Sequence, residues 1–243
     1  MGIAVQRMFD GIATRYDFLN HFLSAGRDRS WRHKAALSFH EDCELKILDL
    51  CGGTGDFWKS WRDLQFTNPN KLKDEGFKVF GVVADFSLPM LKEARRKFLV
   101  EANKGLPIPA LVRMDALKPC FKTGKFDAVI CAYGMRNLDS VQKGIEEILP
   151  LLVSGGTFLT LEFFRPTNLF TRVFYHGLAP LCIPLIGYIF SSRREAYQYL
   201  VQSIQKFKSV FEYQEIFRQN GFVNVSIVAC DFGISHIVTA KKG

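Results

Sequence analysis

The chain lacks several patterns that would assign it to a well-defined class of protein. Its six cysteines, at positions 43, 51, 120, 131, 182 and 230, contain no CxxC spacing. The sequence therefore offers no zinc site, and it favours reduced, largely buried thiols in a cytoplasmic protein. The opening residues MGIAVQRMFD contain no apolar signal core, and Gln6 stands where a myristoylation signal has Ser or Thr. We expect neither export nor an acyl anchor.

The composition also lacks the marks of disorder and of repeat proteins. Hydrophobic residues make up 48% of the 243 residues against 23% charged, and no low-complexity tract or internal repeat is visible. We expect one domain over residues 1–243. The formal charge of +8 favours contact with a polyanion, either nucleic acid or an anionic membrane, although a basic surface without a function fits it equally well.

Strand-like and helical patterns alternate along the chain. Apolar runs end near Asp49, Asp85, Asp115 and Cys131, and helical segments follow at 54–64, 87–103 and 137–150, the third run having only a short connection. Further strands are expected at 156–163, about 222–230 and 234–240. This order predicts an α/β fold with a doubly wound, mainly parallel sheet and a ligand site at the carboxyl ends of its strands. Helical spacing of apolar residues from Val5 to Leu23 predicts a helical cap over residues 1–40.

One segment interrupts this pattern. The run 173–192 contains twenty residues without a formally charged side chain, which is long enough to span a bilayer. Pro180, Pro184 and two glycines interrupt any helix there, and a span would separate the last strands from their sheet. We therefore predict that residues 163–208 form a helical insert, packed on the core or acting as an apolar lid. The polar stretch 65–76 is predicted to be a surface loop.

The stretch LDLCGGTGDFW (48–58) runs from a strand into a glycine-rich turn and a helix. A dinucleotide turn needs a small residue at its end, where this chain has Trp58, and Asp56 would repel a pyrophosphate. No GK[ST] follows, which disfavours a nucleotide phosphate loop. S-adenosylmethionine fits better, because it joins an amino acid to an adenosine without phosphates.

Three acidic residues at strand ends support this cofactor. Asp49 and the turn could meet the amino acid part, Asp85 could accept hydrogen bonds from the ribose hydroxyls, and Asp115 one from the adenine amino group, with the Ala116 amide donating to the ring. Each acid could instead cap a helix. The expected cofactor-binding residues are Asp49, Gly52, Gly53, Thr54, Gly55, Asp85, Phe86, Asp115, Ala116, Ala132 and Tyr133.

Several motifs resemble the class I S-adenosylmethionine methyltransferases, and within them the quinone-ring C-methyltransferases of menaquinone and ubiquinone synthesis. They are MFDGIATRYDFLNHFLSAGRDRSWR (8–32), LDLCGGTGD (48–56), DFSLPML (85–91), FDAVICAYGMRN (126–137), LEFFRP (161–166) and REAYQYLVQSIQKF (194–207). The chain departs from the family in Ser154-Gly155-Gly156, Lys208-Ser209, Ala84 and the tail before the last strand. The resemblance implies a seven-stranded Rossmann-like sheet with a partly antiparallel last pair. It also implies methylation of a polyprenylated hydroquinone on a ring carbon, demethylmenaquinol to menaquinol above all.

This chemistry requires electron density at the ring carbon and a route for a departing proton. Arg136 could hold a developing phenolate or orient a water, and Asn137 could bind the second ring oxygen or cap the next helix. The resemblance adds Tyr16, with Asp17 and Asn20, as contacts of the hydroquinone, although Tyr16 could equally be a core tyrosine. The expected catalytic residues are Arg136, Asn137 and Tyr16, and no metal is expected. His21 and His33 are titratable, but lone histidines on helices are more often packed or solvated.

A polyprenyl tail gives the apolar segment a function in this hypothesis. Its apolar residues within 163–200 could line a tunnel, with Arg165, Arg172, Arg193 and Arg194 facing lipid headgroups. We expect a cytoplasmic protein at the inner face of the cytoplasmic membrane, in transient contact with it, and a homodimer is compatible with the sequence. Nucleic acid is not an expected partner, since no basic tract interleaved with aromatics appears.

Three alternatives stay open. The equivalent step of ubiquinone synthesis differs from the menaquinone step only in the ring, and the chain could also methylate another small phenol, a sterol or RNA. A different class of function is a catalytically silent scaffold of a quinone-synthesis complex that binds the cofactor.

Overall fold

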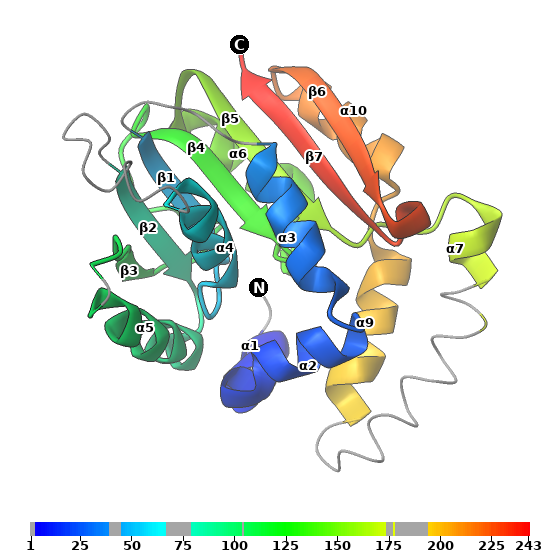
Figure 1. Cartoon of the computed structure of the whole chain (residues 1–243). Helices are drawn as coiled ribbons and strands as arrows, with labels where there is room; N and C mark the ends of the chain where they lie inside the picture. The colour runs from blue at the N-terminus through cyan, green and yellow to red at the C-terminus, as the bar shows by residue number, and fades with distance from the viewer. Residues whose placement is uncertain (1–2, 39–44, 67–78, 104, 174–176, 178–193) are drawn as a thin grey trace.

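The fold is built on one seven-stranded sheet. The computed structural model describes residues 3–38, 45–66, 79–103, 105–173, 177 and 194–243 (Figure 1). The strands lie in the order β3-β2-β1-β4-β5-β7-β6, and β7 alone runs antiparallel to its neighbours β5 and β6. Their bounds are β1 Leu45–Leu50, β2 Val79–Asp85, β3 Ala110–Arg113, β4 Phe126–Ala132, β5 Leu152–Glu162, β6 Phe222–Cys230 and β7 Ser235–Lys242.

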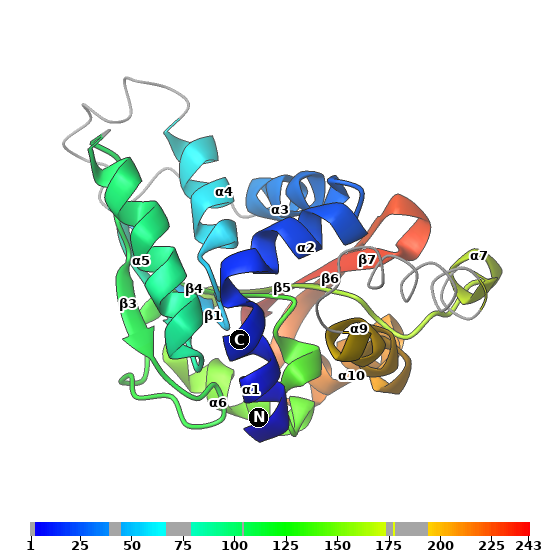
Figure 2. The same cartoon turned by 90° about the horizontal axis from the view of Figure 1, so that it is seen from below.

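Helices cover both faces of the sheet and its carboxyl edge (Figure 2). The α-helices are α1 Ile3–Ile12, α2 Tyr16–Leu23, α3 Arg27–Leu37, α4 Asp56–Gln65, α5 Leu88–Ala102, α6 Val141–Ile148, α7 Leu169–Val173, α9 Arg194–Lys206 and α10 Val210–Gln219. Short 3-10 helices are η1 Ala13–Arg15, η2 Met135–Asn137, η3 Leu149–Leu151 and η5 Asp231–Gly233.

Each face of the sheet buries its own aromatic core. On one face α3 and α4 bring Trp31, Trp58 and Trp61 against the apolar side chains of the central strands, and α5 packs in the same core. On the other face α6 packs in the core to which α10 contributes Tyr213 and Phe217, and the ring of Phe217 stacks on that of a strand residue at 5.2 Å. Because central parallel strands are buried on both faces, they read as continuous apolar runs, which is why the sequence located them.

The sequence located most elements within a few residues. The structure confirms the mainly parallel, doubly wound sheet. It also confirms helices at the N-terminus of the chain and helices before the last two strands. The predicted helix at 137–150 begins only at Val141, because Ser140 caps it by accepting a hydrogen bond from the Lys143 amide. Strand β5 starts four residues earlier than predicted, since Leu152 already pairs with Phe126 across a register shift. The division into cap, core and insert within one domain stays a prediction.

Two predictions concern segments that the structure leaves largely undescribed. The polar stretch 65–76 and the uncharged run 173–192 lie almost entirely outside the described residues. Among the helices that are described, none combines the length and the apolar character needed to cross a bilayer.

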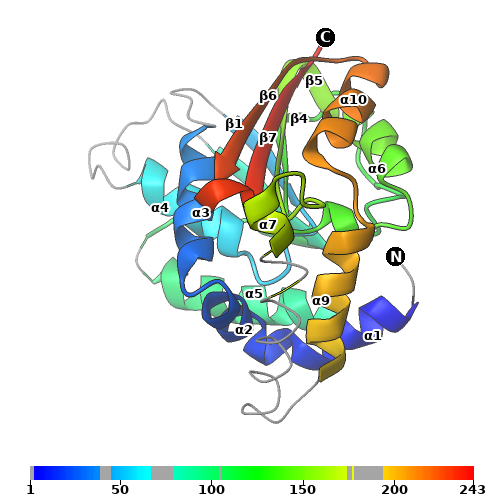
Figure 3. The same ribbon diagram turned by 90° about the vertical axis from the view of Figure 1, so that its right-hand side faces the viewer.

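The N-terminal helices and α9 lie together beyond the carboxyl ends of the central strands (Figures 1 and 3). The ring of Phe9 in α1 meets that of Tyr199 in α9 edge-on, with centroids 6.4 Å apart. Two segments almost two hundred residues apart in the chain therefore close over the sheet edge where α/β folds bind ligands.

Candidate active site

The glycine turn after β1 depends on backbone conformations that ordinary residues avoid. Gly53 and Gly55 have φ of 56° and 79°, and Cys51 has φ of 56°. A Cβ on Gly55 would lie 2.3 Å from the ring of Phe98 in α5, so the turn and α5 approach closely only because the residue is glycine. The Gly52 amide donates to the Ala84 carbonyl at 3.0 Å, which joins the turn to β2.

Asp85, at the end of β2, holds two turns at once. Its Oδ2 accepts a hydrogen bond from the Gly53 amide at 2.9 Å, and its Oδ1 accepts one from the Ser87 amide at 2.8 Å. Burial raises the pKa of its carboxyl to about 6, against these hydrogen bonds. The N-cap of α5 is Ser87, so the alternative role of Asp85 as that cap is wrong.

Asp49 lies beneath the turn and is fully buried. One oxygen accepts a hydrogen bond from the Trp58 amide at 3.2 Å, whereas Oδ1 has no hydrogen-bond partner in the described structure. Burial raises the pKa of this carboxyl to about 7, with the nearby charge of Asp85 acting in the same direction. A buried carboxyl with an unused oxygen is a group that a cationic ligand stabilises.

A cavity opens above the turn, at the carboxyl edge of β1, β2 and β4. The predicted site residues that line it are Tyr16, Gly53, Asp85, Phe86, Asp115, Ala116, Tyr133 and Asn137, together with Phe9, Cys51, Ser87, Met90, Met114, Gly134 and Leu138. The predicted residues outside this lining are Asp49, Gly52, Thr54, Gly55, Ala132 and Arg136. The structure thus brings both ends of the predicted cofactor site, Asp85 and Asp115, to one apolar cavity. Asp115 also accepts a hydrogen bond from the Leu117 amide at 3.0 Å.

Arg136 is buried beside this cavity and paired with Glu162. Its Nη1 donates to Glu162 Oε1 at 2.5 Å and to the Tyr133 carbonyl at 2.9 Å, whereas its buried Nε has no hydrogen-bond partner among the described residues. The guanidinium also lies 5.6 Å from the centroid of the Phe163 ring. The protein therefore holds one edge of the cation and leaves Nε without a partner.

Sequence reasoning gave Glu162 no role. It ends β5 with no exposed surface, and its oxygens also accept hydrogen bonds from the Phe163 and Arg136 amides. Burial raises the pKa of its carboxyl, opposed by the charge of Arg136. The available signal was a single acidic residue in the otherwise uncharged run 156–164, at the carboxyl end of a predicted strand.

Asn137 and Tyr199 form a second pair that the sequence did not reveal. Asn137 Nδ2 donates to the Tyr133 carbonyl at 3.1 Å, and the Tyr199 hydroxyl donates to Asn137 Oδ1 at 2.9 Å. Since Ser140 caps α6, the alternative role of Asn137 as the helix cap is wrong. Tyr199 lies in α9, inside the insert, so the insert contacts the site through a specific hydrogen bond.

Tyr16 combines the two roles considered for it. It packs with Ile12 and Met90 in a small apolar cluster, and it also lines the cavity. Burial raises the pKa of its hydroxyl, while the charges of Arg136 and Arg32 act to lower it.

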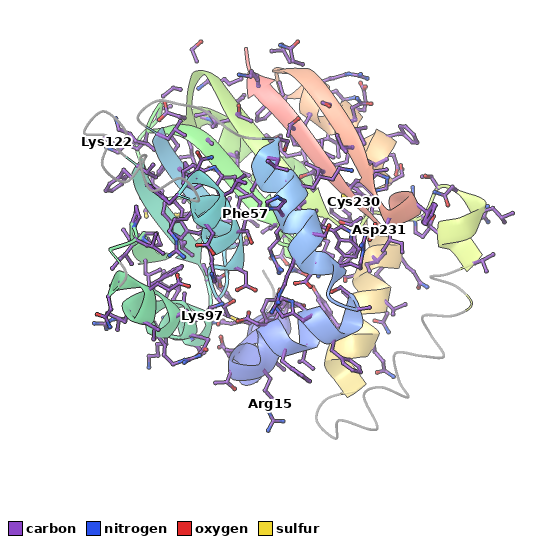
Figure 4. All side chains as sticks on the ribbon, viewed as in Figure 1. Arg15, Phe57, Lys97, Lys122, Cys230 and Asp231 are labelled. Carbon is purple, nitrogen blue, oxygen red and sulfur yellow. The ribbon has the colours of Figure 1, made fainter. Side chains whose placement is uncertain are left out.

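A chain of charged groups fastens the N-terminal helices to the glycine turn. Asp17 accepts a hydrogen bond from the Thr54 hydroxyl at 2.5 Å and pairs with Lys97 at 2.7 Å, and Lys97 also pairs with Asp56 at 2.6 Å. Lys97 lies between α5 and the N-terminal helices (Figure 4). Asp17 is therefore used in closing the cap and does not line the cavity, in contrast to the contact implied for it by the resemblance.

The two histidines considered as bases lie away from the cavity. His21 pairs with Asp28 at 2.7 Å, and the exposed His33 lines a separate surface groove between α3 and α4. No cluster of metal-ligating side chains occurs within the part of the chain that the structure describes.

Comparisons with known proteins agree with this geometry. A methyltransferase from Thermotoga maritima has the same fold, with a TM-score of 0.63 at 14% identity over 98% of this chain and 99% of its own. The fold is therefore that of the S-adenosylmethionine-dependent methyltransferases. The model of the ubiE/COQ5 methyltransferase family matches residues 2–242, and the chain belongs to this family.

Two curated relatives extend over nearly the whole chain. The demethylmenaquinone methyltransferase of Deinococcus radiodurans is 36% identical over 99% of this chain and 93% of its own length. The ubiquinone/menaquinone biosynthesis C-methyltransferase UbiE of Geotalea uraniireducens is 33% identical over 99% and 97%.

Proposed function

We propose that this protein transfers a methyl group from S-adenosylmethionine to a ring carbon of a polyprenylated hydroquinone, converting demethylmenaquinol to menaquinol. The observation that carries the proposal is the family match over residues 2–242 together with relatives named for this reaction. The site supports it independently, because a buried arginine with an unpartnered nitrogen lies next to a cavity whose acidic residues suit an adenosine.

The cavity fits the cofactor by the chemistry of its residues. Asp85 offers two carboxylate oxygens to the ribose hydroxyls. Asp49 does not line the cavity, and its buried carboxyl beneath the turn would act on the amino group through its negative charge. Apolar walls formed by Met90, Met114 and Ala116 suit the adenine ring. When bound, S-adenosylmethionine supplies an electrophilic methyl group on a sulfonium.

The chain's own residues supply the activation of the ring. An oxygen held by the Arg136 guanidinium carries more negative charge, which increases electron density at the ring carbon next to it. Glu162 keeps the guanidinium charged and fixes its orientation, and the Phe163 ring lies 5.6 Å from the cation. Arg136 does not accept the proton, since a guanidinium stays protonated in proteins.

A second candidate is the same reaction on a benzoquinol in ubiquinone synthesis. The name of the relative from Geotalea uraniireducens covers both pathways, and the two substrates differ by one fused ring. The location at the inner face of the cytoplasmic membrane, the membrane contact and the homodimer belong to the same proposal as predictions.

The test is a methyl-transfer assay with radiolabelled S-adenosylmethionine. Purified protein receives demethylmenaquinol and, in parallel, the benzoquinol precursor, in detergent under reducing conditions. Label in the naphthoquinol product alone supports the proposal, and label in the benzoquinol product alone supports the second candidate. Absence of label in both, with cofactor binding retained in calorimetry, would overturn the proposed substrate class.

A further inference from the structure

A methyltransferase needs two binding spaces that meet at one point, because the cofactor and the acceptor bind together. The cavity above the glycine turn contains the residues suited to the cofactor. A separate groove runs between η2, the start of α6, α9 and α10, and its lining includes Arg136, Leu138, Tyr199 and Gln202. Leu138 lines both spaces, and Asn137 and Arg136 lie on their two sides. The groove therefore reaches the cavity at η2.

The boundary between the two spaces is formed by aromatic rings and hydrogen-bonding side chains, which suit a hydroxylated aromatic ring. The hydrogen bond from the Tyr199 hydroxyl to Asn137 Oδ1, at 2.9 Å, closes it from the side of α9. The ring of Phe9 lies edge-on to Tyr199 at 6.4 Å and edge-on to Tyr16 at 6.0 Å, so three aromatic rings form a row from α2 to α9. Aromatic rings favour such offset and edge-on contacts with another ring.

The groove also brings the acceptor to a buried cation. Arg136 lines the groove, its side chain is 6% exposed, and Glu162 holds its Nη1, while its Nε has no hydrogen-bond partner among the described residues. An oxygen entering from the groove reaches this cation without passing through the cofactor cavity. Tyr199 and Asn137, now bonded to each other, would each exchange that bond for one to the entering molecule.

We propose that the groove between η2 and α9 is the acceptor site, and that Tyr199 and Arg136 hold the hydroxyl groups of a hydroquinone that enters through it. This rests on the proposed function and deepens it, because it assigns the second substrate a place and a route. Tyr199 is then a substrate-binding residue that the insert contributes to the site.

The first test compares Tyr199→Phe with Tyr213→Phe. Both variants lose a phenolic hydroxyl, but Tyr213 is fully buried, its hydroxyl pairs with that of Thr160, and it does not line the groove. With one hydrogen bond lost, kcat/KM for the hydroquinone should fall roughly three- to tenfold in Tyr199→Phe. The dissociation constant of S-adenosylmethionine from calorimetry should stay within about twofold of the parent value, since its cavity is intact. Tyr213→Phe should keep the kcat/KM of the parent protein.

The second test fills the groove from its exposed side with Gln202→Trp. This change should raise KM for the hydroquinone by roughly tenfold or more through steric exclusion, with cofactor binding unchanged. Equal kcat/KM for Tyr199→Phe, Gln202→Trp and the parent protein would overturn the acceptor site while leaving the proposed function intact. Loss of cofactor binding in Gln202→Trp, with its melting temperature retained, would assign the groove to the cofactor instead. An inactive parent protein would contradict the proposed function itself.

Discussion

At the scale of single residues, the candidate site contains charged side chains that are almost fully buried. Glu162 and Arg136 form an ion pair in which the carboxylate has no exposed surface and the cation has 6%. Such a pair costs free energy to bury, so its presence beside a cavity points to a use for the cation. Asp49 is the opposite case, a buried carboxyl whose Oδ1 has no hydrogen-bond partner in the part of the chain that the structure describes.

We predict that Glu162→Gln lowers kcat/KM for the hydroquinone by roughly 100-fold, because Arg136 loses the group that orients it. The dissociation constant of S-adenosylmethionine should change by less than about threefold, since Glu162 lies outside the cofactor cavity. Steady-state kinetics with both substrates varied would measure this separation. Glu146→Gln, on the exposed face of α6, is the control with the same chemical change. A parallel loss of cofactor binding would show that Glu162 acts only on the fold.

We predict that Asp49 makes the cofactor-free protein less stable as the pH rises from about 4 to about 7. The folded pKa of about 7 lies above the ordinary value of 3.8, so the folded state binds more protons in this window, and stability decreases with pH. The free energy of unfolding of Asp49→Asn relative to the parent protein should therefore rise across the window, by up to about 4 kcal/mol. Urea unfolding at several pH values measures it, and parallel curves for the two proteins would contradict it.

At the scale of elements, the helical cap is tied to the sheet by Lys97. This side chain of α5 pairs with Asp17 of α2 and with Asp56, the first residue of α4, at 2.7 and 2.6 Å. The three groups are at most 28% exposed, so solvent screens them only in part. Asp17 also accepts a hydrogen bond from the hydroxyl of Thr54 in the glycine turn. This bond couples the position of the cap to the turn.

We predict that Lys97→Met loosens α2 without unfolding the sheet. Loss of these charged hydrogen bonds should weaken the attachment of the cap by about 1–2 kcal/mol, so amide hydrogens of residues 16–23 should exchange roughly ten times faster. Hydrogen exchange measured by mass spectrometry tests this, with Lys92→Met on the exposed side of α5 as the control. Unchanged exchange in α2 would show that apolar packing alone holds the cap.

At the scale of the whole molecule, the net charge of +8 bears on where the protein finds its acceptor. A polyprenylated hydroquinone resides in a bilayer, and an anionic surface attracts a basic protein by about 1 kcal/mol for each cationic side chain near it. Long-range attraction of this kind is screened within about 10 Å at 0.1 M salt.

We predict that the protein sediments with vesicles containing anionic lipid at low salt and dissociates from them as salt is raised. Vesicles of zwitterionic lipid alone should bind it at least roughly tenfold more weakly, since they lack the surface charge. Cosedimentation over a range of salt concentrations measures both effects. Equal binding to the two kinds of vesicle at low salt, undiminished as the salt concentration is raised, would contradict the prediction and point to insertion of apolar side chains in place of charge.

The sequence by itself determined the class of the fold and the kind of cofactor. Buried parallel strands are short apolar runs, and the turn after β1 needs glycine where φ is positive, so local residues carry both signals. The same holds for Asp85 and Asp115, which could be placed at one sheet edge because the carboxyl ends of parallel strands meet there.

Only the tertiary structure decided which groups lie beside Arg136 and Asn137. Glu162 reaches Arg136 because the carboxyl ends of β4 and β5 are paired. Tyr199 reaches Asn137, from which it is 62 residues away in the chain, because α9 packs against η2. Asp17 likewise contacts Thr54 and Lys97 and does not line the cavity. Contacts between residues so far apart depend on how elements pack, and the spacing of residues within one element carries no record of its partners in another.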